Sequence, residues 1–114
     1  MKKATIMVAF LVTGLLSAQE IKPKYEIVGN EIRATYFYDN GQIKQVGNYL
    51  DGKLNGTWVS YNEQGEKQTI GEYTKGKKTG QWVFFSDEKL SQVNYTENKI
   101  EDVKVWKQEI VAKN

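Results

Sequence analysis

The side chains that most often carry out catalysis are missing from this 114-residue chain, which contains no histidine and no cysteine. Without histidine there is no imidazole base, triad or imidazole metal ligand, and without cysteine there is no thiol nucleophile, zinc thiolate or disulfide. The stretch 76–80 (GKKTG) lacks the spacing of a phosphate-binding loop. The sequence therefore predicts no catalytic residue, no cofactor and no metal site.

Carboxylates remain as candidates for acid–base chemistry. They fall into two groups, Glu63, Glu66 and Glu72, and Asp51, Glu97, Glu101 and Asp102. Two carboxylates on one sheet face would suit glycoside hydrolysis, and the second group would suit calcium if it had the spacing of a calcium loop, which it lacks. We interpret both groups as solvated surface and keep a carboxylate-dependent hydrolase as an alternative.

Aromatic rings, 12% of the residues, are the remaining functional candidates. Two sets are regularly spaced, Tyr49, Tyr73 and Tyr95, and Trp58, Trp82 and Trp106. These rings could form a platform for sugars or for the side chains of a partner, or they could be the core of a domain with little else to bury. We favour the core interpretation and keep the platform as the candidate binding site.

Both aromatic sets belong to an internal repeat. Residues 37–58 (FYDNGQIKQVGNYLDGKLNGTW) align with residues 61–82 (YNEQGEKQTIGEYTKGKKTGQW) at an offset of 24. A half unit begins near Gly29, and a weaker third unit begins at Phe85 with offsets of 22 to 24. Regular inner units between degenerate outer ones are typical of a repeat array.

Each unit contains two turn signals. The first is Asn40-Gly41 and then Gln64-Gly65, and the second is Gly29-Asn30, Asp51-Gly52, Lys75-Gly76 and Glu97-Asn98. Asn-Gly between strands predicts a type I′ hairpin turn, and the last position of the second signal holds only glycine or asparagine, which tolerate left-handed backbone. The predicted turn residues are Asn30, Asn40, Gly41, Gly52, Gly65, Gly76 and Asn98.

Runs rich in β-branched and aromatic residues separate the turns, at 33–39, 42–50, 56–62, 66–74, 80–86, 89–96 and 103–111. The last run also suits a short helix, although we favour a strand. The predicted fold class is all-β: an antiparallel β-meander of seven or eight strands, built from hairpin repeats of about 24 residues. It would follow a cleaved N-terminal signal helix.

Two glycines, Gly47 and Gly71, fall in the middle of predicted strands, where glycine lowers stability unless something needs the space. One hypothesis places the rings of Trp58 and Trp82 over the backbone that these glycines expose. The alternative is that the glycines mark β-bulges.

The N-terminus has the features of a secretory signal peptide: two lysines, an apolar run from Ile6 to Leu16 and small residues at Ser17 and Ala18. The run is shorter than the roughly 20 residues of a membrane-spanning helix. We therefore predict a signal peptide at 1–18, a flexible lead-in at 19–28 and the repeat domain at 29–111. The protein would be exported, to the periplasm or outside the cell.

Cleavage would also change the charge balance. Of 16 lysines and arginines, Lys2 and Lys3 leave with the signal, so 14 remain against 14 acidic residues. Nucleic-acid binding needs an excess of basic residues on one face, and attraction to an anionic membrane surface needs a basic patch. We therefore expect no nucleic-acid partner and consider membrane-surface binding unlikely.

The repeat unit, Tyr/Phe-x-Asx/Glx-x-Gly, then Gly-x-Tyr-x-x-Gly-x-x-x-Gly-x-Trp, resembles the MORN-repeat variant of the antitoxin-like MORN-variant proteins. The resemblance covers 37–82 closely and 83–100 loosely, and the exported layout is similar to that of small flavobacterial members. Its pattern is carried by Gly41, Gly47, Tyr49, Gly52, Gly56 and Trp58, and by Gly65, Gly71, Tyr73, Gly76, Gly80 and Trp82. In the third unit Lys89, Tyr95, Asn98 and Asp102 stand at or near expected glycines. The resemblance implies a β-hairpin array used for binding or assembly.

The leading functional hypothesis is an exported, non-enzymatic β-repeat module that binds a protein or an envelope component. The first alternative is a structural protein that associates with itself through open sheet edges, since an open meander leaves two strands unpaired on one side.

Overall fold

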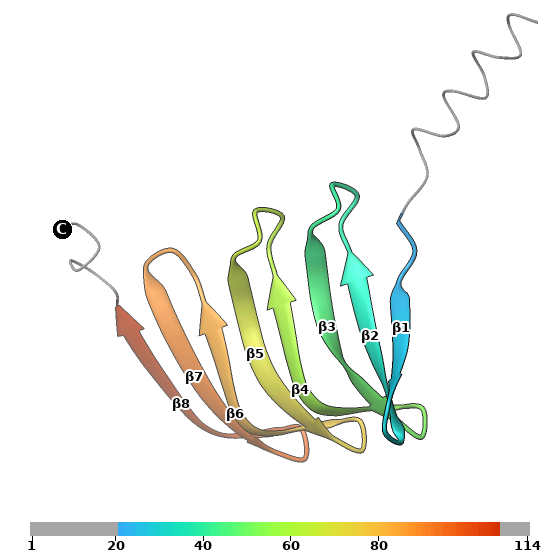
Figure 1. Cartoon of the computed structure of the whole chain (residues 1–114). Coiled ribbons are helices and arrows are strands. Elements are labelled where there is room, and N and C mark those ends of the chain that lie inside the picture. The colour runs from blue at the N-terminus through green and yellow to red at the C-terminus, as the bar shows by residue number, and fades with distance from the viewer. Residues whose placement is uncertain (1–20, 108–114) are drawn as a thin grey trace, which may run out of the picture.

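The computed structural model describes residues 21–107, which form one antiparallel sheet with the strand order β1 to β8 (Figure 1). The strands are β1 (Lys24–Val28), β2 (Glu31–Phe37), β3 (Ile43–Leu50), β4 (Lys53–Tyr61), β5 (Lys67–Thr74), β6 (Lys77–Phe85), β7 (Lys89–Thr96) and β8 (Lys99–Lys107). These residues contain no helix, and the predicted all-β meander is confirmed. The signal peptide predicted at 1–18 and the end of the last run, 108–111, lie outside the described residues.

The boundaries of the sheet differ from the prediction at both ends. The lead-in at 19–28 was predicted to be flexible, which is wrong for Lys24–Val28, because these residues pair with β2 as strand β1. The last strand begins at Lys99 instead of residue 103, because a two-residue turn leads directly into it. The described part of the final run is therefore a strand and not a helix.

The lower turns, which join β3 to β4, β5 to β6 and β7 to β8, are of type I′, and Gly52, Gly76 and Asn98 have the left-handed backbone expected of them. Both central residues have positive φ, with values of 52° and 79° at Asp51-Gly52, 53° and 83° at Lys75-Gly76, and 48° and 72° at Glu97-Asn98. Asn30 lies in the first turn, as predicted, but the left-handed residue of that turn is Gly29, with a φ of 65°. Glycine at the first central position is the arrangement of a type II′ turn.

The upper loops are not the predicted two-residue type I′ turns. The Tyr38 N–H donates to the carbonyl of Gln42 at 2.9 Å, so three residues form the loop, and only Gly41 among them has positive φ. The Asn40 side chain instead accepts a hydrogen bond from the Gln42 N–H at 2.9 Å. The second unit repeats this loop with Gly65, which is the three-residue hairpin with a glycine bulge.

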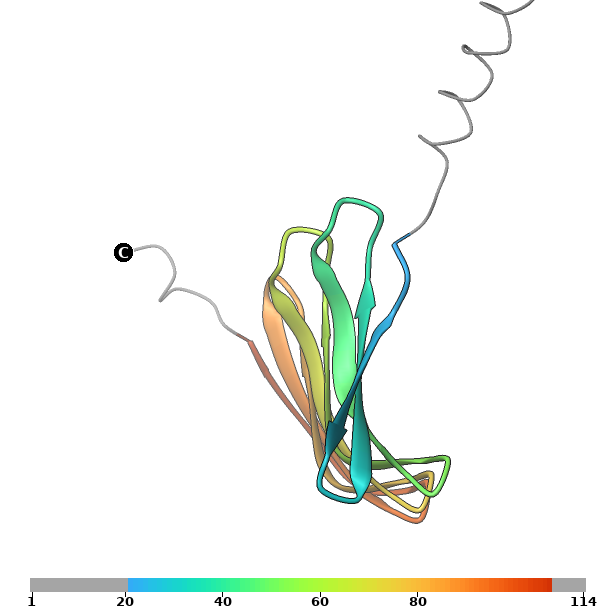
Figure 2. The same cartoon turned by 45° about the vertical axis from the view of Figure 1, so that its right-hand side comes forward.

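β-Bulges with two extra residues bend the sheet near its lower edge. Val46 pairs with Val59 and Asn48 with Asn55, so Gly47 alone on β3 faces residues 56–58 of β4. The same irregularity recurs where Gly71 of β5 faces residues 80–82 of β6. Figure 2 shows the three lower hairpin ends bent to the same side of the strands.

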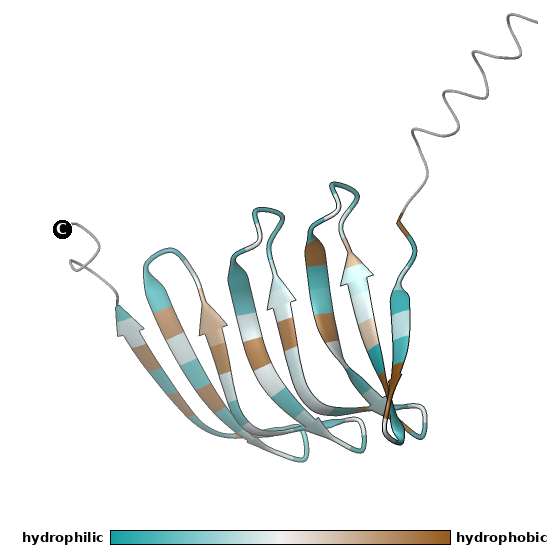
Figure 3. Ribbon diagram, viewed as in Figure 1, coloured by the Kyte–Doolittle hydropathy of each residue, from teal (hydrophilic) through white to brown (hydrophobic). Residues whose placement is uncertain are grey.

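The sheet is a single layer, so its buried apolar residues are few: Ala34, Trp58, Trp82 and Val93. The pairing places all four on one face, which we call the tryptophan face. The opposite face carries an apolar row across the middle strands, made of Val46, Val59, Ile70 and Val83. Figure 3 shows such apolar bands recurring from strand to strand.

Candidate binding groove

The two central tryptophans lie on glycines. A Cβ atom added to Gly47 would be 2.0 Å from Cδ2 of Trp58, and one added to Gly71 would be 2.1 Å from Cδ2 of Trp82. No side chain fits there, so the hypothesis that the rings cover glycine backbone is confirmed. The bulge alternative also holds, because the register shifts at the same two glycines.

The indole N–H of each of these tryptophans donates a hydrogen bond to a backbone carbonyl of the sheet. Nε1 of Trp58 donates to the carbonyl of Asn48, and Nε1 of Trp82 donates to the carbonyl of Glu72, each at 3.1 Å. Both tryptophans are only 5% exposed. They are therefore core residues, and neither indole N–H is free for a ligand.

Tyrosines alternate with the tryptophans to form a continuous row of rings. Ring centroids are 5.3 Å apart for Tyr49–Trp58, 6.3 Å for Trp58–Tyr73, 5.1 Å for Tyr73–Trp82 and 5.8 Å for Trp82–Tyr95, and the interplanar angles are 73° to 85°. Edge-to-face pairs of this kind contribute about 0.5–1.5 kcal/mol each. The structure thus brings five of the six predicted residues together in one aromatic row.

Trp106, the sixth predicted residue, lies on the other face of the sheet. Val103 belongs to the tryptophan face because it pairs with Val93, which pairs with Trp82, and Trp106 is three positions further along β8. It pairs with Leu90 and is 45% exposed. The turn spacing does not reveal this, because Trp106 is only two residues further from Asn98 than Trp82 is from Gly76; the face changes because Glu101 is an extra residue in β8.

An open groove with a volume of about 310 Å³ lies over the aromatic row. Leu54 and Lys78, from the bent ends of β4 and β6, line it together with Tyr73, which pairs with Lys78 from the strand between them. The remaining lining residues are Gln45, Trp58, Val59, Ser60, Thr69, Trp82 and Phe84. Sequence reasoning did not select Leu54 or Lys78, because their approach to the row depends on the bulges.

Lys78 brings the positive charge of the groove to the aromatic row. Its Nζ lies 5.0 Å from the ring centroid of Trp82 and 5.0 Å from that of Tyr95, within the range of a cation–π interaction. The backbone N–H of Lys78 donates a hydrogen bond to Oδ1 of Asn98, in the next hairpin, at 2.8 Å. The ammonium group of Lys78 therefore lies beside the rings of Trp82 and Tyr95.

Two tyrosines of this face have raised pKa values. The hydroxyls of Tyr36 and Tyr49 are 2.9 Å apart, and this hydrogen bond, with burial, raises the pKa of Tyr36 well above its usual value. Burial, with a smaller contribution from Tyr95, raises the pKa of Tyr73. Both phenols therefore lose their protons at a higher pH than an unperturbed tyrosine does.

The carboxylates selected from the sequence do not gather around this groove. Glu66 accepts a hydrogen bond from Nδ2 of Asn62 at 2.8 Å within an upper loop, and Glu72 lies 3.5 Å from Oγ1 of Thr57 on the opposite face. Residues 21–107 contain no group of three acidic side chains placed to hold a metal ion. Glu31, which sequence reasoning missed, accepts hydrogen bonds from Asn48 and Asn55 at 2.8 and 3.3 Å.

Fold and groove together define a single-sheet β-repeat array with a ladder of aromatic rings along one face. No protein-family model matches the chain, and no curated protein matches it. Within residues 21–107 there is no helix with the length and apolar character that crossing a bilayer requires.

Proposed function

We propose that the protein is an exported, non-enzymatic β-repeat module of the MORN-variant kind, which binds a protein or an envelope component through the groove of the tryptophan face. The observation that carries this proposal is the groove itself. It combines half-buried aromatic and aliphatic side chains with hydroxyl and amide groups and one ammonium group. Binding sites typically combine apolar walls with a few fixed polar groups in this way.

The groove is also preorganised for binding. The tryptophan rings beneath it are fixed by contact with Gly47 and Gly71 and by hydrogen bonds to backbone carbonyls. A ligand that contacts this surface would therefore order few side chains, which lowers the entropic cost of association. The non-enzymatic part of the proposal is supported by the carboxylates, which lie on loops and on the opposite face.

Affinity capture from the cell envelope tests the proposal, with the full chain expressed with its leader as bait. Ser60 and Thr69 are paired neighbours in the groove, so Ser60→Arg or Thr69→Arg would fill it. Gln81→Arg is the matched control, because Gln81 is exposed and adjoins Trp82 in the strand, so it lies on the opposite face. We expect the captured component to be lost with either groove variant and kept with the control. Equal capture by all three variants would show that binding occurs elsewhere.

A further inference from the structure

The outermost strands expose apolar side chains at both ends of the sheet. On β1, Tyr25 is 60% and Ile27 85% exposed, and on β8, Val103 is 53% and Val105 55% exposed. Within residues 21–107 each of these strands pairs on one side only. Unpaired strand edges are templates for another strand unless charges, prolines or a covering element block them, and repeat arrays usually end in polar caps.

These apolar side chains lie on the same face of the sheet. Tyr25 pairs with Ala34, and Val103 pairs with Val93, so both belong to the tryptophan face. In addition, the strands alternate in direction from β1 to β8, so β1 and β8 run antiparallel. A second copy in the same orientation would present its β1 antiparallel to β8 of the first, with the apolar faces aligned.

We propose that β8 of one copy pairs with β1 of a second copy, so that the sheet continues from molecule to molecule. The contact is heterologous, because it joins two different edges. Such contacts produce open filaments, or rings if the rotation between copies closes. The proposed interface does not use the groove and is independent of the proposed binding function.

The bulge in β8 restricts this pairing to one register. Asn94 pairs with Asp102 but Tyr95 with Ile100, so Glu101 is an extra residue and the regular part of β8 is 102–107. The five residues of β1 fit on these six in two registers. One of them would place Ile27 of the tryptophan face opposite Lys104 of the other face, and a one-residue slip of this kind is excluded where the faces differ. The register with Ile27 opposite Val103 remains.

In this register the side chains across the contact are complementary on both faces. On the tryptophan face, Ile27 meets Val103 and Tyr25 meets Val105, which would cover four exposed apolar groups. On the other face, Glu26 meets the ammonium of Lys104. Opposite charges and apolar groups directly across two strands stabilise their pairing.

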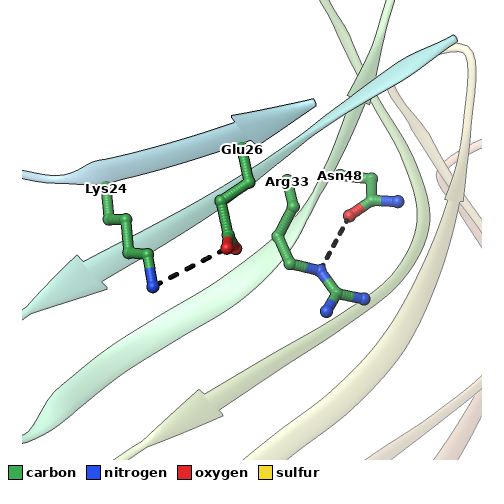
Figure 4. Close-up of polar contacts among 4 residues, drawn as sticks. All are labelled: Lys24, Glu26, Arg33 and Asn48. Atoms are coloured by element: carbon green, nitrogen blue, oxygen red, sulfur yellow. Dashed lines mark hydrogen bonds and ion pairs between the residues drawn. The ribbon is translucent and has the colours of Figure 1, made fainter. Parts of the chain in front are cut away.

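One end of the contact also fits this register, because Lys24 faces the exposed ring of Trp106, as a cation–π pair would require. At the other end Val28 faces Asp102 beside the bulge, and this pair adds nothing to the contact. Figure 4 shows the side chains of Lys24 and Glu26 extending from β1 on the same side, with Nζ and Oε2 3.7 Å apart. The two charged groups of β1 pair with each other and lie on the face where, in this register, they would meet Trp106 and Lys104.

Charge reversal at Glu26 and Lys104 tests the proposal. The full chain is expressed with its leader and processed, and its average mass is measured by sedimentation velocity over a range of concentrations. We expect the average mass to rise with concentration beyond two copies. Glu26→Lys and Lys104→Glu should each weaken association about 10-fold, since an opposite-charge pair becomes a like-charge pair. The double variant, E26K/K104E, restores an opposite pair and should recover most of the affinity. Glu63→Lys and Lys77→Glu, at exposed sites away from the contact, are matched controls.

The outcomes separate this contact from the other ways in which two copies could meet. A monomer at every concentration would overturn the proposal, and so would a mass that stops at two copies without rescue by the double variant. A symmetric β8–β8 contact would respond to K104E and not to E26K, and a β1–β1 contact would do the reverse. Only the proposed contact predicts rescue by the double variant. Fluorescence of the buried Trp58 and Trp82 reports that each variant is folded.

Discussion

At the scale of single residues, the contact between glycine and tryptophan fixes the centre of each repeat. Gly71 has no positive φ, so its role is not backbone freedom. Its role is to leave space for the ring of Trp82, whose atoms lie where a Cβ would be. Stability at this site is therefore a matter of packing.

Gly71→Ala should destabilise the protein by about 2–3 kcal/mol, the cost of overpacking a site that cannot expand. Gly71→Val should cost more. Urea unfolding followed by tryptophan fluorescence measures the effect. Gln68→Ala, at an exposed position of the same strand, is the control and should change the free energy of unfolding by less than about 0.5 kcal/mol.

The Trp82→Ala background isolates this contact. Removing the ring alone should cost about 3–5 kcal/mol. Once the ring is absent, Gly71→Ala should cost much less than it does in the native protein, because the added methyl no longer meets an indole. Additive losses in the double variant would contradict the packing explanation.

The raised pKa of Tyr36 predicts a dependence of stability on alkaline pH. Because the folded state holds this proton more tightly than the unfolded state, the contribution is complete below the unfolded pKa of about 10 and is lost as the pH rises above it. Unfolding free energies measured from pH 8 to pH 11 should therefore fall more steeply for the native protein than for Tyr36→Phe. Equal slopes would show that the hydrogen bond to Tyr49 does not shift the titration.

The sequence predicted the partners in this row to different degrees. The period of 24 aligned Trp58 with Trp82 and Gly47 with Gly71, and two copies of the same pairing made their contact a specific hypothesis. Trp106 escaped prediction because a face is decided by counting residues from the turn, bulges included. β8 has one extra residue where β4 and β6 have two, so its tryptophan lies on the opposite face.

At the scale of secondary-structure elements, the lower turns combine a favourable second residue with an unfavourable first one. A type I′ turn needs positive φ at both central positions, yet Asp51, Lys75 and Glu97 occupy the first position, at φ of 48° to 53°. Left-handed backbone is costly for a residue with a Cβ, and asparagine and glycine tolerate it best. These turns therefore retain some strain.

Lys75→Gly should raise the free energy of unfolding by about 0.5–1 kcal/mol, because it removes this strain, even though glycine has more freedom in the unfolded chain. Lys75→Asn should have a similar effect. Thermal unfolding followed by circular dichroism measures the change. Lys77→Gly, two residues later within β6, is the control and should lower stability, since glycine weakens a strand.

Hydrogen bonds between neighbouring hairpins hold the repeats in register. At the lower edge, the N–H groups of Gly76 and Asn98 donate to the carbonyls of Leu54 and Lys78, each at 2.9 Å. At the upper edge, the hydroxyl of Tyr38 donates to the carbonyl of Tyr61 at 2.7 Å. Turn residues were predictable from the sequence, but these links were not, because they depend on how far each bulge bends its hairpin.

At the scale of the whole molecule, each repeat contacts only its neighbours. The strand order follows the sequence without a crossover, and along the aromatic row each ring contacts the next one. Stability in such an array is approximately the sum of the repeats and the interfaces between them. This architecture could be predicted from the repeat, whereas the groove could not, because it requires the bend.

A chain with one more repeat should therefore be more stable. A second copy of residues 61–84, inserted after Phe84, would repeat the tryptophan–glycine contact and extend the aromatic row by two rings. We expect a higher free energy of unfolding in urea and a larger dependence on denaturant, because more surface is buried on folding. Inserting the same 24 residues in shuffled order is the control and should give neither gain. If the ordered insertion left both quantities unchanged, the repeats would not be acting as equivalent units, and the contacts between them could not account for the stability of the sheet.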